Sequence, residues 1–328
     1  MSYETERRVA LEAVIQACRL CQAVQRAHLA EGVLNKEDQS PVTVADFGAQ
    51  AVVSDHLAAA FPHIPLVGEE DSGALQRREN ARVREALLKH VRRIVPRLSE
   101  KEIFAAIDRG NANAGPRGRF WVLDPIDGTK GFLRGDQYAV ALALIEEGQV
   151  RLGVLGCPSL PLASLQGAGG SLFVAVRGQG SAMRPIEKDE ERRVRVGDIS
   201  NPSEALFCES FESSHSSHED MDEIVKRLAV KRPPLRMDSQ AKYGLLARGD
   251  GTVYLRLPTR TSYVEKIWDH AAGCILVEEA GGKVTDLAGK PLDFSHGNTL
   301  INNKGVIATN GKLHDMVLSA VQSVISKQ

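Results

Sequence analysis

The chain has 328 residues, of which 43% are hydrophobic and 25% charged, and its formal net charge is −1 at pH 7. This composition is ordinary for a soluble globular protein, and the length allows two domains with a substantial core. The near-neutral charge gives no electrostatic reason to expect binding to nucleic acid or to an anionic membrane.

The apolar runs, the N-terminal segment and the cysteines indicate where the protein is located and whether disulfides are expected. No apolar run approaches the length of a membrane helix, and the N-terminal MSYETERRVALEAV has no apolar signal core. We therefore expect a cytoplasmic protein. The five cysteines are few, odd in number and dispersed, so a disulfide framework is not expected. Cys18 and Cys21 lie in a helical pattern, and we interpret them as core or helix-surface thiols rather than zinc ligands.

The first hundred residues are dominated by helical patterns. The predicted helices cover residues 5–30, 43–61, 80–95 and 99–110. Thr43-Val-Ala-Asp46 and Ser99 with Glu102 both fit capping boxes at helix starts. Residues 32–41 are polar and loop-like, whereas Leu66-Val67-Gly68 is typical of a short strand that ends in three acids. These acids are either a solvated loop or metal ligands.

The segment Phe120–Phe132, FWVLDPIDGTKGF, is the most informative stretch. Phe-Trp-Val-Leu predicts a buried strand, after which Asp124 and Asp127 lie on a loop that proline and glycine fix. Two aspartates three residues apart, with a carbonyl between them, can offer several oxygens to a small divalent cation such as Mg²⁺. A lone pair of this kind is more often only a capped turn, so other carboxylates must support the metal site.

The remaining chain divides into two parts that differ in their order of strands and helices. Two hairpins are predicted, at residues 138–156 and 172–180, which indicates an antiparallel sheet packed by helices. The polar stretch 185–202 is a plausible domain boundary. Beyond it, strands alternate with helices, which favours a more parallel α/β layer. We expect strands at 205–208, 253–257, 283–285 and 305–308, and helices at 219–229, 240–248, 267–280 and from residue 312.

Three separated acidic motifs call for one explanation. They are GEED at 68–71, DPIDGTKGF at 124–132 and WDHAAG at 268–273. Together they resemble the Mg²⁺-dependent, lithium-sensitive phosphatases that include inositol monophosphatase and fructose bisphosphatase. Four longer segments resemble the 3′(2′),5′-bisphosphate nucleotidases within that superfamily. These are KEDQSPVTVADFGAQ (36–50), SSHSSHED (213–220), DSQAKYGLLARGDGTVYLRLP (238–258) and EKIWDHAAG (265–273), so the resemblance covers essentially the whole chain.

The resemblance implies an α/β (α+β) fold, a layered αβαβα sandwich with the site between two domains. We expect an antiparallel-sheet metal-binding domain over residues 1–190 and a smaller α/β nucleotide domain over 191–328. By motif, one Mg²⁺ would be held by Glu69, Asp124 and the Ile126 carbonyl, and a second by Asp124, Asp127 and Asp269. A third ion would lie near Glu69. Asp46 and Thr129 would form the pair that takes a proton from the attacking water.

The same resemblance implies which residues bind the substrate. The phosphate would meet Gly128, Thr129 and Asp269, and the nucleotide would meet His215, Ser239, Lys242 and Arg256. Each of the nucleotide contacts also has a simpler interpretation. His215 with His218 could be the surface start of a helix, and Lys242 could be a solvated helix lysine. Arg256 within a strand is harder to dismiss, because a buried arginine needs an anion.

The implied activity is hydrolysis of the 3′-phosphate of adenosine 3′,5′-bisphosphate to AMP, with 3′-phosphoadenosine 5′-phosphosulfate as a second substrate. A metal-activated water would attack in line, and Li⁺ and Na⁺ would inhibit. Such an enzyme would serve sulfur metabolism or salt tolerance, and we expect a monomer. Two alternatives stay open: an inositol polyphosphate 1-phosphatase, and a nucleotide sensor without turnover. The intact pair Asp46 and Thr129 argues against the sensor.

Overall fold

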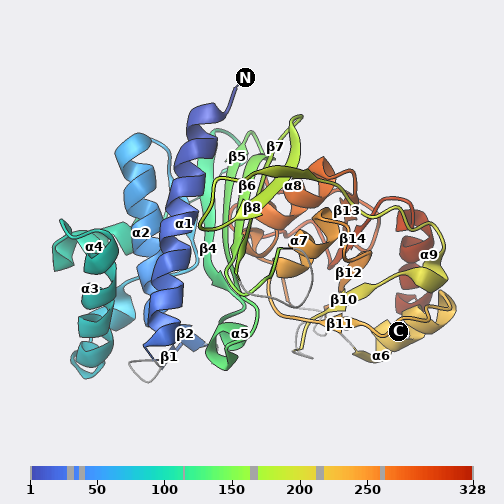
Figure 1. Cartoon of the computed structure of the whole chain (residues 1–328), viewed down its shortest axis with the longest axis horizontal. Helices are drawn as coiled ribbons and strands as arrows, with labels where there is room; N and C mark the ends of the chain where they lie inside the picture. The colour runs from blue at the N-terminus through green and yellow to red at the C-terminus, as the bar shows by residue number, and fades with distance from the viewer. Residues whose placement is uncertain are drawn as a thin grey trace.

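The computed structural model describes residues 2–27, 33–36, 41–113, 115–162, 169–211, 218–258 and 263–326. Within these ranges the chain forms two large sheets with helices between them and outside them, so that five layers alternate across the molecule (Figure 1). This is the αβαβα arrangement that the sequence predicts.

The larger sheet has seven strands in the described part of the chain. Their spatial order follows the sequence: β3 (Leu66–Gly68), β4 (Arg119–Asp127), β5 (Ala139–Glu146), β6 (Gln149–Cys157), β7 (Ser171–Val176), β8 (Gly180–Pro185) and β9 (Arg192–Val194). The pair β3 and β4 is parallel, whereas all the later neighbours are antiparallel. The predicted hairpins are therefore confirmed, and the predicted antiparallel character applies to all but the first pair.

The smaller sheet is mixed rather than mainly parallel. Its order is β11 (Leu235–Arg236), β10 (Phe207–Glu209), β12 (Val253–Arg256), β14 (Val306–Thr309) and β13 (Lys283–Thr285). The strand β10 runs parallel to both β11 and β12, and β14 is antiparallel to both of its neighbours. The expectation of a more parallel layer was thus right for three strands and wrong for the other two.

The helices form the remaining layers. Their bounds are α1 (Glu4–Arg26), α2 (Val44–Ala60), α3 (Ala81–Ile94), α4 (Glu100–Asp108), α5 (Thr129–Arg134), α6 (His218–Arg227), α7 (Ala241–Ala247), α8 (Ala271–Glu279) and α9 (His314–Ile325). The helices α1, α2 and α3 share a core with one face of the larger sheet, α7 and α8 fill the space between the sheets, and α6 and α9 cover the smaller sheet. Both expected capping boxes are present, at Thr43 and Ser99.

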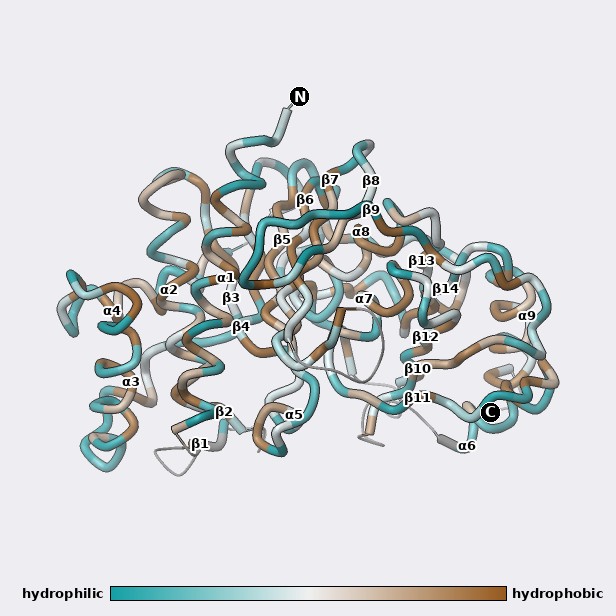
Figure 2. The backbone as a smooth tube through the Cα atoms, viewed as in Figure 1, coloured by the Kyte–Doolittle hydropathy of each residue, from teal (hydrophilic) through white to brown (hydrophobic). Residues whose placement is uncertain are grey.

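The central strand β4 explains why its apolar residues do not alternate with polar ones. Trp121 and Leu123 belong to the core beneath the outer helices, whereas Phe120 and Val122 belong to the core shared with α7 and α8. A strand buried on both faces has no reason to be polar at every second position. Figure 2 shows the resulting hydrophobic character along the strands of the larger sheet and along α8.

Three local expectations need correction. The strand β4 does not stop before the aspartates but continues to Asp127, with a shift in its pairing with β5 between Asp124 and Asp127. The polar segment before α2 contains two short antiparallel strands, β1 (Val33–Asn35) and β2 (Pro41–Thr43). The polar stretch after β8 contains β9, which extends the larger sheet. The cysteines, by contrast, are all free and buried, as expected.

Candidate active site

Asp46 and Thr129 meet although they lie far apart in the sequence. The Asp46 carboxylate is buried at the first turn of α2, where its Oδ2 accepts the Thr43 N–H at 2.8 Å. Its other oxygen, Oδ1, accepts the Thr129 hydroxyl at 3.2 Å, and the same hydroxyl lies 3.2 Å from the Ile126 carbonyl oxygen. Burial raises the pKa of Asp46 to about 6, although the hydrogen bonds from Thr43 oppose the rise. A carboxylate with this pKa can accept a proton near neutral pH.

Asp124 and Asp127 lie at the end of β4. Asp124 is buried, and its Oδ1 has no hydrogen-bond partner among the residues that the structure describes. Burial raises the pKa of Asp124 well above its usual value, and the nearby charges of Glu69, Asp127 and Asp269 raise it further. Asp127 Oδ2 accepts the backbone N–H of Gln240 at 2.6 Å, which joins the end of β4 to the start of α7.

The acids after β3 are held by two residues that the sequence reasoning missed. The Lys36 ammonium lies 2.6 Å from Glu69 Oε1 and 2.7 Å from Glu70 Oε1. Gln50 on α2 fixes the backbone here, because its Oε1 accepts the Glu70 N–H at 3.1 Å and its Nε2 donates to the Ile107 carbonyl at 2.8 Å. Burial, followed by the charge of Glu69, raises the pKa of Glu70 well above its usual value. The KEDQSPVT motif contains Lys36, but nothing in the local pattern indicates its partners.

The predicted nucleotide contacts follow the carboxyl ends of parallel strands. Ser239 comes three residues after β11 ends, and Arg256 is the last residue of β12. Ligands of α/β sheets bind beyond such strand ends. Ser239 also lies against Gly128, since a Cβ on that glycine would be 3.0 Å from the Ser239 Cβ. The predicted contact His215 lies outside the described residues.

Lys242 is a buried cation in α7, not a solvated helix lysine. Its side chain is 2% exposed, its Nζ donates to the Met237 carbonyl at 3.0 Å, and the ammonium lies 5.1 Å from the centre of the Tyr254 ring. Burial lowers the pKa of Lys242 to about 8, although the charge of Asp127 opposes the fall. No carboxylate of the described residues forms an ion pair with this ammonium, although the charges of Asp127 and Asp238 act on it. A buried ammonium of this kind is well suited to an incoming anion.

Asp269 lies in a short 3₁₀ turn, Ile267–Asp269, immediately before α8. Its Oδ2 is 3.4 Å from an Arg256 Nη, and Arg256 Nε is 2.8 Å from Glu265. Among the described residues, Glu265, Asp269 and His270 form the one group of three possible ligands whose atoms lie within 4.8 Å of one another. Glu265 is engaged with both Arg256 and His270, so we interpret this group as an ion-pair network. No three of the predicted carboxylate ligands form such a group within the described part of the chain.

The acidic residues nevertheless fit a divalent cation. Glu69, Asp124, Asp127 and Asp269 supply hard oxygen ligands, which Mg²⁺ prefers. Burial and mutual repulsion raise the pKa values of Asp124 and Asp269, and one Asp124 oxygen has no partner among the described residues. A bound cation would offset the repulsion between these carboxylates and would give the unpartnered Asp124 oxygen a contact. The residues that could hold it are these four carboxylates and the Ile126 carbonyl.

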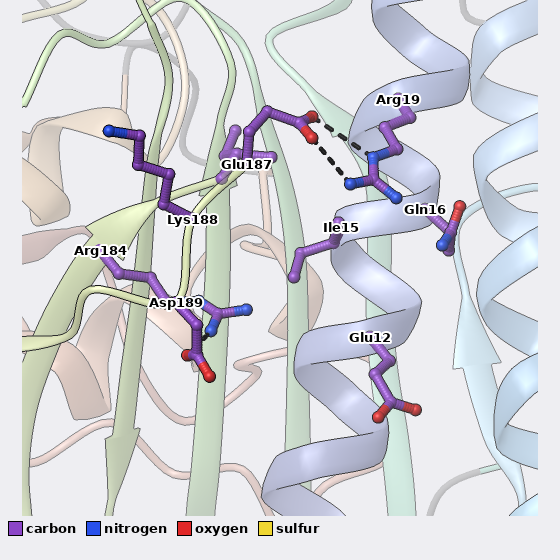
Figure 3. Close-up of a pocket in the computed structure, with 9 residues that line it drawn as sticks. Glu12, Ile15, Gln16, Arg19, Arg184, Glu187, Lys188 and Asp189 are labelled. Carbon is purple, nitrogen blue, oxygen red and sulfur yellow. Dashed lines mark hydrogen bonds and ion pairs between the residues drawn. The ribbon is translucent and has the colours of Figure 1, made fainter.

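A separate hollow of about 310 Å³ lies between α1 and the segment that follows β8. Figure 3 shows Arg19 and Glu187 paired across it, with Arg184 and Asp189 paired beside them. None of the predicted site residues lines this hollow. Its charges already compensate one another, so it is not the candidate active site.

Comparisons with known proteins identify the family. The sequence profile of the Inositol monophosphatase family matches residues 2–326. A protein from rice named 3′(2′),5′-bisphosphate nucleotidase is 49% identical over 99% of this chain and 96% of its own length. One of the same name from Schizosaccharomyces pombe is 45% identical over 100% and 98%, and 3′(2′),5′-bisphosphate nucleotidase 1 from Arabidopsis thaliana is 51% identical over 100% and 98%. The chain belongs to the inositol monophosphatase family, in its bisphosphate nucleotidase branch.

Solved structures agree on the fold. The inositol monophosphatase from Thermotoga maritima superposes with a TM-score of 0.67 at 21% identity, covering 97% of this chain and 96% of its own. The enzyme from Anabaena gives 0.65 at 22% identity, with full coverage of both chains. These structures show the fold alone. The family profile and the curated relatives show that the chain is an enzyme of the phosphoric monoester hydrolase class that acts on a small molecule, in a family that is generally metal dependent. No helix in the described ranges is long and apolar enough to span a membrane.

Proposed function

We propose that this chain hydrolyses the 3′-phosphate of adenosine 3′,5′-bisphosphate to give AMP, and also accepts 3′-phosphoadenosine 5′-phosphosulfate. The observation that carries the proposal is the junction between the acidic end of β4 and the strand ends of the smaller sheet. Asp127 binds the Gln240 backbone, and Gly128 touches Ser239. A phosphate at the acids would therefore have two cations, the buried Lys242 and the partly buried Arg256, within the same site.

Asp46 and Thr129 would act on the proton of the attacking water. The Thr129 hydroxyl donates to Asp46 Oδ1, which leaves its oxygen free to accept a hydrogen bond from water. The Asp46 carboxylate, whose pKa is about 6, would take up the proton that passes through this pair. The Gly128 backbone would lie against the transferred phosphoryl group, because glycine permits close approach.

Glu69, Asp124, Asp127, Asp269 and the Ile126 carbonyl would hold two or three Mg²⁺ ions. Bound Mg²⁺ supplies charge neutralisation of the phosphoryl group and lowers the pKa of water. Li⁺ and Na⁺ would inhibit by competing for one of these positions. The cluster would lie between a metal-binding part, residues 1–190, and a nucleotide-binding part, residues 191–328, whose strand β9 still extends the larger sheet.

Selectivity for a nucleotide would come from Ser239, Lys242, Arg256 and His215. Lys242 is buried and Arg256 is partly buried, with a side chain 12% exposed, and both cations suit a second, non-reacting phosphate. The names of relatives that are 45–51% identical favour the nucleotide over an inositol phosphate. We expect a cytoplasmic monomer that binds neither nucleic acid nor membranes.

The test is phosphate release from adenosine 3′,5′-bisphosphate and from inositol 1,4-bisphosphate, each with Mg²⁺ and with or without millimolar Li⁺. Fast, Li⁺-sensitive release from the nucleotide is the expected result. Release from the inositol substrate alone would retain the metal chemistry and refute the nucleotide assignment. Release from neither substrate would favour a nucleotide sensor.

A further inference from the structure

Arg256 is held between two carboxylates at the end of β12. Its Nε lies 2.8 Å from Glu265 Oε2, and one Nη lies 3.4 Å from Asp269 Oδ2 and 3.2 Å from the Tyr263 hydroxyl. The Arg256 side chain is 12% exposed and that of Glu265 is 3% exposed. The guanidinium therefore has one edge fixed inside the protein and one edge beside the acidic cluster.

Glu265 is itself held by a contact with His270. Its Oε2 is 3.1 Å from His270 Nε2, and His270 Nδ1 is 2.9 Å from the Tyr243 hydroxyl. His270 and Tyr243 are fully buried, and Tyr243 packs against Gly273 of α8, where a Cβ would overlap its ring. A continuous chain of polar contacts thus runs from the interior between the two sheets to the guanidinium of Arg256.

We infer that Glu265 is a positioning residue that, backed by His270 and Tyr243, holds Arg256 in place to bind the non-reacting 5′-phosphate of the substrate. The inference rests on the proposed function, which it extends to a residue outside the metal and substrate contacts. Glu265 has no direct role with substrate in this scheme. It acts through Arg256 alone.

The electrostatics support a permanent ion pair between Glu265 and Arg256. Burial opposes the charged form of Glu265, but the charge of Arg256 and the contact with His270 outweigh it and lower the pKa of Glu265 to about 2. Without this carboxylate, the remaining carboxylate beside Arg256 in the described structure would be Asp269. The guanidinium would then be drawn toward a proposed cation ligand and away from the phosphate. Partners that orient metal-binding side chains are typically worth about 10- to 100-fold in metal affinity or activity, and we expect an effect of the same order for this arginine.

The decisive experiment compares binding of AMP, which carries the 5′-phosphate, with binding of adenosine, which does not, by calorimetry in the full chain with Mg²⁺. Glu265→Gln is expected to weaken AMP binding about 10- to 100-fold while adenosine changes less than about twofold. In turnover, KM for adenosine 3′,5′-bisphosphate rises by a similar factor, whereas kcat and the hydrolysis of adenosine 3′-phosphate are retained. Glu265→Asp, which keeps the charge, is expected to restore part of the affinity.

The matched control is Glu279→Gln on α8. Glu279 also pairs with an arginine, Arg177 at 3.6 Å, and accepts the N–H groups of Gly178 and Gly180. Loss of this pair is expected to leave the preference for AMP over adenosine unchanged. If Glu265→Gln does not fold, Glu265→Asp and Tyr243→Phe decide instead, because both keep the carboxylate while loosening its hold on Arg256.

The inference is wrong if none of the folded variants weakens AMP relative to adenosine, or if both ligands are lost together. Binding of AMP requires no turnover, so the two proposals can fail separately. A protein that binds AMP but releases no phosphate from the bisphosphate refutes the proposed function alone. Failure of the unaltered protein to bind AMP refutes both.

Discussion

Replacement of Gly128 by alanine tests whether the end of β4 and the start of α7 must approach each other closely. Gly128 has φ +86°, and an added Cβ would lie 3.0 Å from Ser239 Cβ and 3.3 Å from the Ser239 backbone nitrogen. Ordinary contacts of a Cβ begin near 3.4 Å. Because a backbone nitrogen cannot rotate away, the two segments must separate by several tenths of an ångström.

The left-handed backbone costs a non-glycine residue about 1–2 kcal/mol, and overpacking typically adds about 1–3 kcal/mol. We therefore expect Gly128→Ala to lower the free energy of unfolding by about 2–5 kcal/mol. A misplacement of about 1 Å at reacting groups can cost about 100-fold, and the displacement here is smaller, so kcat/KM for adenosine 3′,5′-bisphosphate should fall by less than that factor.

The matched control is Gly135→Ala at the other end of α5. Gly135 has φ +78°, but a Cβ there would meet no atom within 4 Å. This variant should lose about 1–2 kcal/mol of stability and keep its activity. Urea denaturation and steady-state kinetics would be measured on both variants. Equal activity losses would show that backbone strain, and not the contact with Ser239, limits the site.

The other predictions concern individual side chains. Thr129→Ala should lower kcat by about 10²- to 10⁴-fold with little change in KM, and Thr129→Ser should retain most activity; a change confined to KM would refute its role in proton transfer. Lys242→Ala should raise KM for the bisphosphate but not for adenosine 3′-phosphate, and because the pKa of Lys242 is about 8, KM of the unaltered enzyme should rise as the pH passes through that value. Asp124→Asn should abolish Mg²⁺-dependent turnover yet raise the melting temperature in EDTA, since the raised pKa of Asp124 means that folding disfavours its charge; a lower melting temperature would contradict this reasoning. The pKa of Asp46 is also raised, to about 6, so the stability that its protonated form contributes is complete below the usual carboxyl pKa and lost as the pH rises through 6; denaturation in EDTA from pH 4 to 8 should follow this fall, and Asp46→Asn should flatten it.

Local chemistry made much of the fold predictable. Thr43 with Asp46 and Ser99 with Glu102 are capping boxes that involve only four consecutive residues, so sequence located both helix starts. The end of β4 was less predictable, because a proline followed by an aspartate and a glycine is typical of a loop. The shifted pairing between Asp124 and Asp127 lets the strand continue past a residue that has no N–H to donate.

Contacts between distant segments could not be predicted in the same way. Lys36 is a single lysine in a polar segment, and its two carboxylate partners lie 33 and 34 residues away. The chain of contacts from Tyr243 through His270 to Glu265 likewise joins α7 to the segment before α8, with no common spacing. The strand β9 lay in a stretch expected to be a boundary, because its exposed arginines protect the edge of a sheet instead of indicating a core strand.

Neutralising an acid of the candidate site and neutralising an acid outside it should change the stability of the protein in opposite directions. Asp124 is buried among like charges, and its pKa is raised well above the usual value. Glu279 instead accepts two backbone N–H groups and pairs with Arg177, so its charge is compensated. Loss of charge at Asp124 should stabilise the metal-free protein and remove activity, whereas Glu279→Gln should destabilise the protein and leave the chemistry intact. A carboxylate that weakens the fold persists where a cation or a substrate uses its charge, which is the physical reason to assign function to Asp124 and only structure to Glu279.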